Sequence, residues 1–316
     1  MTTRIFIDGA VGTTGLEIRE RLAARKDLTL TALGEAARKD AKARKNALNS
    51  ADIAILCLPD DAAREAVSLI ENPAVRVIDP STAHRTAPGW TFGFPELEPT
   101  RRAELKAATR VTNPGCYPTG FLALVRPLVR AGILPADWPV TCNAVSGYSG
   151  GGKSMIAEFE DRTAANYSAE TFRAYGLSLE HKHVEEMRHH AGLTQRPLFA
   201  PSVARFYRGM LVEVPLQLWA LPGNPPLARL HEALADSYSG EPLVEVASLA
   251  QSAVMKGLDA EELKNTNRLK LYVFGAAKGA QARLVAVLDN LGKGASGACV
   301  QNLNVMLGRS ETEGLL

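Results

Sequence analysis

Short apolar runs alternate with amphipathic stretches over the first third of the chain. The apolar runs predict strands at 4–7, 28–33, 52–58 and 74–78. The stretches between them predict helices at 14–24 and 62–70, and the aspartates of Pro59-Asp60-Asp61 can cap the second of these. Strands that alternate with helices require right-handed crossovers, so this part of the chain predicts a Rossmann-type, doubly wound parallel sheet.

The pattern changes beyond residue 116, where strands follow one another with Gly or Pro turns between several of them. This part predicts strands at 203–208, 210–219, 270–274 and 282–288, and helical stretches at 178–190, from about 227, and at 295–307. Such a succession is typical of an antiparallel sheet in an α+β domain. We expect the last helix to pack back on the first domain. The predicted division is a dinucleotide-binding domain of residues 1–115 plus 295–316 and a catalytic and oligomerisation domain of residues 116–294.

The composition is that of an ordinary globular chain, with 316 residues of which 46% are hydrophobic and 22% charged. The 36 basic and 34 acidic residues leave a net charge of +2, and the absence of any block of like charge argues against a nucleic-acid partner. No apolar run approaches the roughly 20 residues of a membrane span, and the N-terminus shows no signal-peptide pattern. We therefore expect a cytoplasmic protein with no membrane partner.

A glycine-rich turn follows the first predicted strand and leads into the first predicted helix. Its glycines, Gly9, Gly12 and Gly15, permit a tight turn and close approach of a ligand to the backbone, while the helix N-terminus offers N–H groups to a pyrophosphate. Glycines in such a turn also serve simply to pack a helix on a strand. The strand–turn–helix context favours cofactor binding, with candidate contacts at Gly9, Val11, Gly12, Thr13, Thr14 and Gly15.

Charged residues after the second predicted strand bear on the choice of cofactor. Glu35 can accept a hydrogen bond from a ribose hydroxyl, as in NAD-binding domains. Arg38, Lys39 and Lys42 follow closely and can instead bind a 2′-phosphate. We favour NADP, with Arg38 as the candidate contact.

The four cysteines are too few and too scattered for a disulfide framework, and none forms a CxxC pair. Cys57, Cys142 and Cys299 lie in apolar segments and are interpreted as buried fillers. Cys116 differs, because it follows a Pro-Gly turn in the block 113–120 (NPGCYPTG) and precedes the helical run 121–130. A helix N-terminus favours the thiolate and can hold an oxyanion at an attacked carbonyl. Cys116 is therefore the candidate nucleophile.

Four of the six histidines fall within residues 181–190. His183 and Glu186 are three apart and share one face if the segment is helical, so Glu186 can orient the imidazole as a general base. His181 is an equal candidate for that base. A metal site is the competing interpretation, but the sequence holds no second ligand cluster, and we predict no metal. His189 and His190 are interpreted as part of a solvated helix face.

Polar loops between apolar strands supply candidate anion-binding groups. Arg85 suits a carboxylate or phosphate because its planar fork can bind two oxygens, and Lys153 ends a Gly-rich loop that lacks the spacing of an ATP-binding loop. Taken alone, each of these charged residues could equally be a surface group that binds no ligand. The candidate substrate contacts are Ser81, Arg85, Asn113, Ser149 and Lys153.

The motifs taken together resemble a known family across essentially the whole chain. They are Gly9-x-x-Gly12-x-x-Gly15, the blocks 79–85 (DPSTAHR), 92–97 (FGFPEL), 113–120 (NPGCYPTG) and 146–153 (SGYSGGGK), His181-Lys-His183-x-x-Glu186, and the block 289–295 (DNLGKGA). The chain resembles the shorter type of N-acetyl-γ-glutamyl-phosphate reductases, within the aspartate-semialdehyde dehydrogenase superfamily. The block around Cys116 is the most specific of these motifs.

The resemblance implies an NADPH-dependent reduction of an acyl phosphate in arginine biosynthesis. Cys116 would form a thioester and expel phosphate, and His183 or His181 would handle the hydroxyl proton. Asn290 and Lys293 would lie towards the nicotinamide end of the cofactor. The resemblance also implies a small anionic substrate, N-acetyl-γ-glutamyl phosphate, and a homodimer or homotetramer assembled through the sheet of the second domain.

Two alternatives stay open. A related acyl-phosphate reductase, such as an aspartate-semialdehyde dehydrogenase, shares the cysteine and the cofactor chemistry. A Cys-His hydrolase or a non-catalytic nucleotide-binding regulator is a different class of protein. A hydrolase has no use for the glycine-rich turn, however, and a regulator has no use for a thiol at a helix N-terminus.

Overall fold

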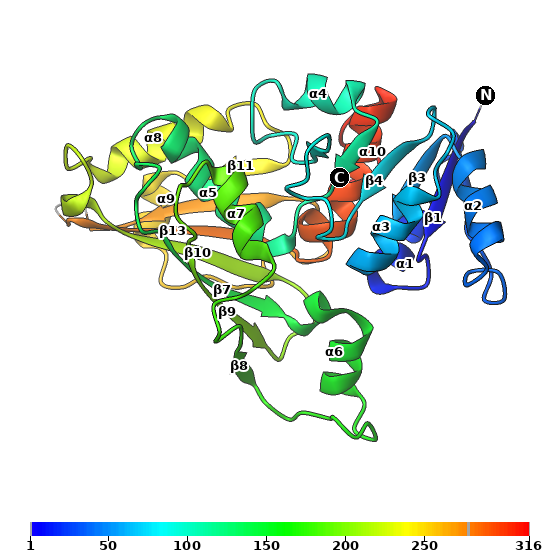
Figure 1. Ribbon diagram of the computed structural model, residues 1–316. Coiled ribbons are helices and arrows are strands. Elements are labelled where there is room, and N and C mark those ends of the chain that lie inside the picture. The colour runs from blue at the N-terminus through cyan, green and yellow to red at the C-terminus, as the bar shows by residue number, and fades with distance from the viewer. Residues whose placement is uncertain (1, 277–278, 316) are drawn as a thin grey trace. The chain divides into compact units, whose positions relative to one another are not determined.

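The computed structural model describes residues 2–276 and 279–315, and the chain divides into two compact units (Figure 1). Unit 1 comprises residues 1–115 and 295–316, and unit 2 comprises residues 116–294. No described helix is long and apolar enough to cross a membrane.

Unit 1 is built on a parallel sheet of six strands in the order β2-β1-β3-β4-β6-β5. The strands are β1 (Thr3–Asp8), β2 (Leu28–Thr31), β3 (Ile53–Leu56), β4 (Arg76–Asp79), β5 (Thr91–Phe92) and β6 (Arg110–Thr112). The helices are α1 (Thr13–Leu22), α2 (Ala41–Ser50), α3 (Asp60–Ser68), α4 (Arg101–Ala107) and, after unit 2, α10 (Gly297–Leu307). The predicted Rossmann-type sheet is confirmed.

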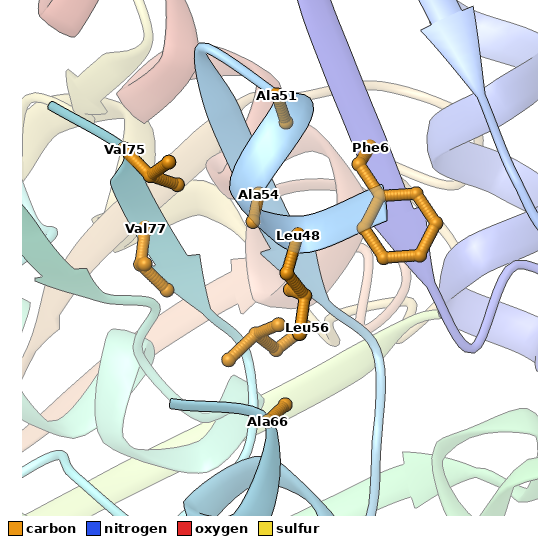
Figure 2. Close-up of a cluster of buried hydrophobic side chains, with 8 residues drawn as sticks. All are labelled: Phe6, Leu48, Ala51, Ala54, Leu56, Ala66, Val75 and Val77. Atoms are coloured by element: carbon orange, nitrogen blue, oxygen red, sulfur yellow. The ribbon is translucent and has the colours of Figure 1, made fainter. Parts of the chain in front are cut away.

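Helices cover both faces of this sheet. On one face Phe6, Ala54 and Val77 pack with Leu48 of α2 and Ala66 of α3 in a buried cluster, and each of these five residues is at most 1% exposed (Figure 2). The opposite face packs against α1 and α10. A strand covered on both sides is apolar at successive positions, which is why 53–56 carries no alternation.

Unit 2 contains a mixed sheet of seven strands in the order β11-β12-β13-β10-β7-β9-β8. The strands are β7 (Thr141–Gly147), β8 (Phe172–Ala174), β9 (Leu198–Ala204), β10 (Met210–Gln217), β11 (Val244–Val246), β12 (Leu269–Phe274) and β13 (Gln281–Leu288). The helices are α5 (Cys116–Arg130), α6 (Gly152–Glu160), α7 (His183–Ala191), α8 (Leu227–Ser237) and α9 (Leu249–Val254), with 3₁₀ turns at Tyr148–Gly151 (η1) and Leu218–Ala220 (η2). Figure 1 shows α5, α7 and α8 on one side of this sheet.

Three details of unit 2 differ from the prediction. The sheet is not purely antiparallel, because β7 pairs parallel with β9 and β11 with β12. Parallel partners need a long crossover, and the segments that hold α6 and α9 supply it. The strand predicted at 203–208 ends at Ala204, since residues beyond it turn towards Gly209, whose φ is +114°. The helix predicted over 178–190 begins only at His183, after a turn closed by Leu179 N–H to the Gly176 carbonyl.

The aspartates before α3 also differ from their predicted role. Asp60 and Asp61 lie in the first turn of the helix, and Pro59 occupies the N-cap with no side-chain cap bond. Asp60 accepts hydrogen bonds from the backbone and hydroxyl of Thr82 instead. It therefore ties α3 to the loop that follows β4.

Candidate active site

Cys116 is the first residue of α5, as the sequence predicts, and its side chain is half-buried. The turn that follows β13 touches it, because a Cβ placed on Gly294 would lie 2.8 Å from the Cys116 Cβ. The helix N-terminus favours negative charge on the sulfur. Cys116 thus combines an exposed edge with an environment suited to a thiolate.

The other three thiols lie in environments that disfavour ionisation. Burial raises the pKa of Cys57 to about 12, and it raises the pKa values of Cys142 and Cys299 well above the usual range. Cys142 and Cys299 are fully enclosed, in β7 and α10. These thiols stay protonated at neutral pH.

His181 and His183 lie together at the start of α7, with ring centroids 4.7 Å apart. The backbone N–H of His183 donates to Nδ1 of His181 at 3.1 Å. Because Nδ1 accepts this bond, the neutral ring of His181 carries its proton on Nε2. His183 and Glu186 are both buried on the inner face of α7, whereas His189 is exposed.

Two tyrosines that the sequence does not single out connect the cysteine to the histidines. Tyr117, next to Cys116, has its ring centroid 6.0 Å from that of His181 and 5.9 Å from that of His183. The Tyr175 hydroxyl donates to the Tyr117 hydroxyl at 2.9 Å, and Tyr117 donates to the Ser202 carbonyl at 3.2 Å. Burial raises the pKa of Tyr175 to about 12, so its hydroxyl stays protonated.

The predicted residues Ser149 and Asn290 meet in unit 2. The Asn290 amide donates to the Ser149 hydroxyl at 2.9 Å and accepts from the Gly209 N–H at 2.8 Å. Lys293 is 1% exposed in the same turn. Lys153 does not lie in the Gly-rich loop, because α6 begins at Gly152. The side chain of Lys153 is exposed in the first turn of that helix.

The glycine-rich turn of unit 1 has the form that the sequence predicts. Gly9 adopts a φ of +80°, and a Cβ there would lie 2.1 Å from the Cys57 carbonyl oxygen. Gly12 is the N-cap of α1, so Thr13 and Thr14 provide the first N–H groups of the helix, and Val11 is 42% exposed beside them.

A pocket of about 430 Å³ adjoins this turn and is lined by Gly9, Val11, Arg38, Lys39 and Arg44 among others. Arg38 pairs with Glu35, while Lys42 is exposed in α2 and does not line the pocket. Arg44, which the sequence does not single out, is buried and bridges Asp8 at 3.0 Å and Glu65 at 3.0 Å. Burial raises the pKa of Asp8, against the attraction of Arg44. The turn and the basic pocket wall fit an adenine dinucleotide with a 2′-phosphate.

The loop after β4 holds the predicted Ser81 and Arg85. The Ser81 hydroxyl donates to the Asp79 carboxylate at 2.8 Å, and Arg85 donates to the carbonyls of Asn113 at 3.0 Å and Pro80 at 2.8 Å. The Asn113 amide in turn donates to the Ala295 carbonyl and accepts from Asn302. The structure therefore brings these three predicted residues together at the carboxyl ends of β4 and β6, where ligands bind in open α/β sheets.

Comparison with known proteins places this geometry in a family. Residues 4–105 match the semialdehyde dehydrogenase NAD binding domain, and residues 116–290 match the semialdehyde dehydrogenase dimerisation domain. The chain belongs to the semialdehyde dehydrogenase family. Within that family it is 55% identical over 310 residues to the N-acetyl-gamma-glutamyl-phosphate reductases of Brucella ovis and Brucella abortus, covering 98% of this chain and 100% of theirs.

Solved structures share the fold of this family. An aspartate semialdehyde dehydrogenase II from Vibrio cholerae has a TM-score of 0.73 at 16% identity and covers 98% of this chain and 99% of its own. One from Francisella tularensis has a TM-score of 0.70 at 13% identity, with 97% and 100% covered. The predicted family, the fold class and the oxidoreductase class are confirmed, and the matched cofactor domain and the reductase relatives support NADP as the cofactor.

Proposed function

We propose that the chain is an N-acetyl-γ-glutamyl-phosphate reductase that forms N-acetyl-L-glutamate 5-semialdehyde and phosphate in arginine biosynthesis. The relatives at 55% identity carry that name. The observation that carries the chemistry is the half-buried thiol of Cys116 at the N-terminus of α5, with two imidazoles packed on the adjacent Tyr117.

Each group in unit 2 has a part in the proposed reaction. The Cys116 thiolate attacks the acyl carbon, so that a C–S bond forms, the C–O bond to phosphate breaks, and the substrate is held as a thioester. NADPH, when bound at the glycine-rich turn, supplies the hydride that reduces the carbonyl carbon. His181, with its proton on Nε2, donates a hydrogen bond to the oxygen that gains charge. That oxygen takes a proton from solvent and becomes the hydroxyl of a thiohemiacetal. His183, oriented by Glu186, accepts this proton as the carbonyl re-forms, the C–S bond breaks and Cys116 leaves as the thiolate.

The anion-binding residues divide between the two units. In unit 1, Arg38 and Lys39 would hold the 2′-phosphate, and Arg85 would hold the phosphate of the substrate. In unit 2, Ser149 and Lys153 would bind the α-carboxylate, while Asn290 and Lys293 would face the nicotinamide. These roles stay predictions, as do the cytoplasmic location and the absence of a nucleic-acid partner.

The reverse reaction tests this proposal. Purified enzyme should oxidise N-acetylglutamate 5-semialdehyde with NADP⁺ only when phosphate or arsenate is present, because the thioester needs an acceptor. Cys116→Ser should lower this activity by about 10³-fold or more, because a serine hydroxyl stays protonated where a thiol can ionise and is then a weak nucleophile. Cys142→Ala, which removes a buried thiol, serves as the matched control and should retain the activity.

Two results would contradict the proposal. The first is turnover that needs no phosphate, and the second is full activity in Cys116→Ser. A kcat/KM higher for aspartate semialdehyde than for the N-acetylated substrate would instead favour the aspartate-semialdehyde dehydrogenase alternative, whose fold the solved neighbours share.

We also propose that the enzyme is a homodimer or homotetramer assembled through the sheet of unit 2. Residues 116–290 match a dimerisation domain. The sheet face opposite α5 exposes Asn143, Ala200 and Pro215 on adjacent strands. Over β13 the same face is covered, because Val285 and Val287 pack with Met255 and Leu258 after α9. The exposed part over β10, β7 and β9 suits contact with a second copy.

A further inference from the structure

Two carboxylates line the pocket beside the glycine-rich turn, in addition to its basic residues. Asp8 ends β1 and is buried, whereas the side chain of Glu65 in α3 is 54% exposed. Ala62, three residues before Glu65, lines the same pocket, so one face of α3 forms this wall. Glu35, which the sequence suggests as an acceptor for a ribose hydroxyl, does not line the pocket. The acid that meets the ribose must therefore be sought elsewhere.

Arg44 connects the two carboxylates of the pocket wall. Its Nε and Nη2 both donate to Oδ2 of Asp8, at 3.2 and 3.0 Å, and its Nη1 donates to Oε2 of Glu65 at 3.0 Å. The guanidinium is planar, and here it is buried, so these three bonds fix its orientation. Arg44 thereby holds the Glu65 carboxylate in place on the wall, although more than half of that side chain is exposed.

The second oxygen of Glu65 is open to a bound molecule. Within the described part of the chain no group donates a hydrogen bond to Oε1, in contrast to Oε2. The Asp8 carboxylate, by comparison, is buried and accepts from Arg44 and from the Gly9 N–H. An ionised carboxylate only accepts hydrogen bonds, so its complement on a ligand is a hydroxyl and not a phosphate oxygen.

The basic residues of the wall divide into two kinds. Arg38 pairs with Glu35, an exposed residue outside the pocket, and such a pair is weak enough for a phosphate to replace it. Lys39 is exposed on the same wall. Arg44 is instead bound to both carboxylates. A phosphate and a hydroxyl would therefore meet different groups in this pocket.

NADP carries one free hydroxyl beside its 2′-phosphate. In the adenosine ribose the 2′-oxygen bears the phosphate and the 5′-oxygen bears the pyrophosphate, which leaves the 3′-hydroxyl as a donor. We propose that Glu65 accepts a hydrogen bond from this 3′-hydroxyl and that Arg44 is the positioning residue for the Glu65 carboxylate. The inference rests on the proposed 2′-phosphate site at Arg38 and Lys39.

A nucleotide fragment tests this contact without the reaction. Adenosine 2′,5′-bisphosphate carries the 2′-phosphate and the 3′-hydroxyl but no nicotinamide, and its 3′-deoxy analogue lacks only the hydroxyl. Calorimetric titration of the full-length enzyme should give a Kd about tenfold higher for the deoxy analogue, because a hydrogen bond to a charged acceptor is lost. In Glu65→Ala the two Kd values should be equal. Glu65→Gln, which keeps the size of the side chain, should narrow their ratio in the same direction.

Two further variants make the test specific. Arg44→Lys keeps a positive charge beside Asp8, but an ammonium lacks the planar fork that binds both carboxylates. We expect this variant to lose most of the discrimination between the two nucleotides, a ratio that a general loss of stability does not change. Glu71→Gln is the matched control, because Glu71 also forms an ion pair with α2, through Lys45, but is exposed and does not line the pocket. It should keep the wild-type ratio.

Each outcome decides between the roles. Equal Kd values in the wild type, or an unchanged ratio in Glu65→Ala, would overturn the proposal. Tighter binding of both nucleotides by Glu65→Ala at an unchanged ratio would show that Glu65 only repels the 2′-phosphate. A wild-type ratio in Arg44→Lys would overturn the positioning role of Arg44.

Failure of this proposal is distinct from failure of the proposed function. A wild-type enzyme that binds neither nucleotide contradicts the proposed 2′-phosphate site, and the contact with Glu65 with it. The titration uses no step at Cys116, so a negative result in the reverse reaction would leave the binding result unchanged.

Discussion

Because Gly294 has no side chain, the turn after β13 can pack directly against Cys116. Any larger residue would place its Cβ 2.8 Å from the Cys116 Cβ, which is closer than real Cβ atoms approach, and 3.2 Å from the Cys116 Cα, which is a tight contact. The turn after β13 could then no longer rest against the start of α5. Since Asn290 and Lys293 belong to the same turn, the glycine also sets where these two residues lie relative to the sulfur.

Gly294→Ala should therefore lower activity more than stability. The turn or Cys116 must move by several tenths of an ångström, and misplacement of a reacting group by 1 Å can cost about 10²-fold in rate. We expect kcat to fall by about tenfold or more, measured in the phosphate-dependent assay, while the melting temperature changes little. Gly257→Ala is the matched control, because a Cβ there meets nothing within 4 Å. Equal activity of the two variants would contradict this account.

Individual site residues could be predicted where their neighbours in the sequence indicate the local structure. Cys116 could be predicted because a Pro-Gly turn precedes it and a helical run follows it. This order of residues places the cysteine at the start of a helix. Tyr175 and Arg44 could not be found in this way, because their contacts join residues 58 and 36 positions apart. Lys42 faces solvent from the first turn of α2 and does not line the pocket, so its contact with a 2′-phosphate stays a prediction.

At the scale of elements, α10 depends on charged contacts with the start of unit 1. Arg25 donates to the Asn304 side chain at 2.8 Å, and it pairs with Asp27 at 2.8 Å and with Glu313 at 3.1 Å. Arg309, just beyond the helix, lies 3.5 Å from Asp27. These contacts tie the last helix to the segment between α1 and β2.

The Asp27 carboxylate should make unfolding sensitive to acid. Its hydrogen bonds with Arg25 lower the pKa of Asp27 to about 2, whereas an unfolded aspartate has a pKa of about 3.9. The stabilisation is therefore present above about pH 4 and is lost as the pH falls towards 2. We expect the melting temperature of Asp27→Asn to fall less steeply than that of the wild type across this window. Parallel melting curves against pH would show that Asp27 does not contribute.

In unit 1, β1 to β4, α1, α3 and α10 were predictable because each repeats one local pattern, whereas α2, α4, β5 and β6 were not predicted. The strand order of unit 2 was not predictable, since the pairing of β7 with β9 depends on a crossover through α6 and α7 that no turn signal marks. The short edge strands β5, β8 and β11 were missed for a related reason, because runs of two or three residues carry too little periodicity to detect.

At the scale of the whole molecule, the exposed sheet face of unit 2 should govern assembly. Ala200 of β9 lies opposite Asn143 of β7, which in turn lies opposite Glu213 of β10. A charged side chain at position 200 would therefore lie on the same face as these neighbours. Ala200→Arg should dissociate the proposed oligomer, because burying an unpaired guanidinium in an interface is costly. Light scattering coupled to size exclusion would measure the mass. Ala131→Arg, exposed after the end of α5, is the control, and an unchanged mass for Ala200→Arg would argue for assembly elsewhere.

The contact between Cys116 and Gly294 has a consequence for the ancestry of the chain. These are the first and last residues of unit 2, so the inserted segment starts and ends at one point. The host ends meet as well, since Asn113 donates to the Ala295 carbonyl at 3.0 Å. A segment whose two ends coincide can enter a nucleotide-binding domain without separating the host's own strands. Cys116 is the first residue of this segment, so a single insertion would have supplied both the second sheet and the proposed nucleophile.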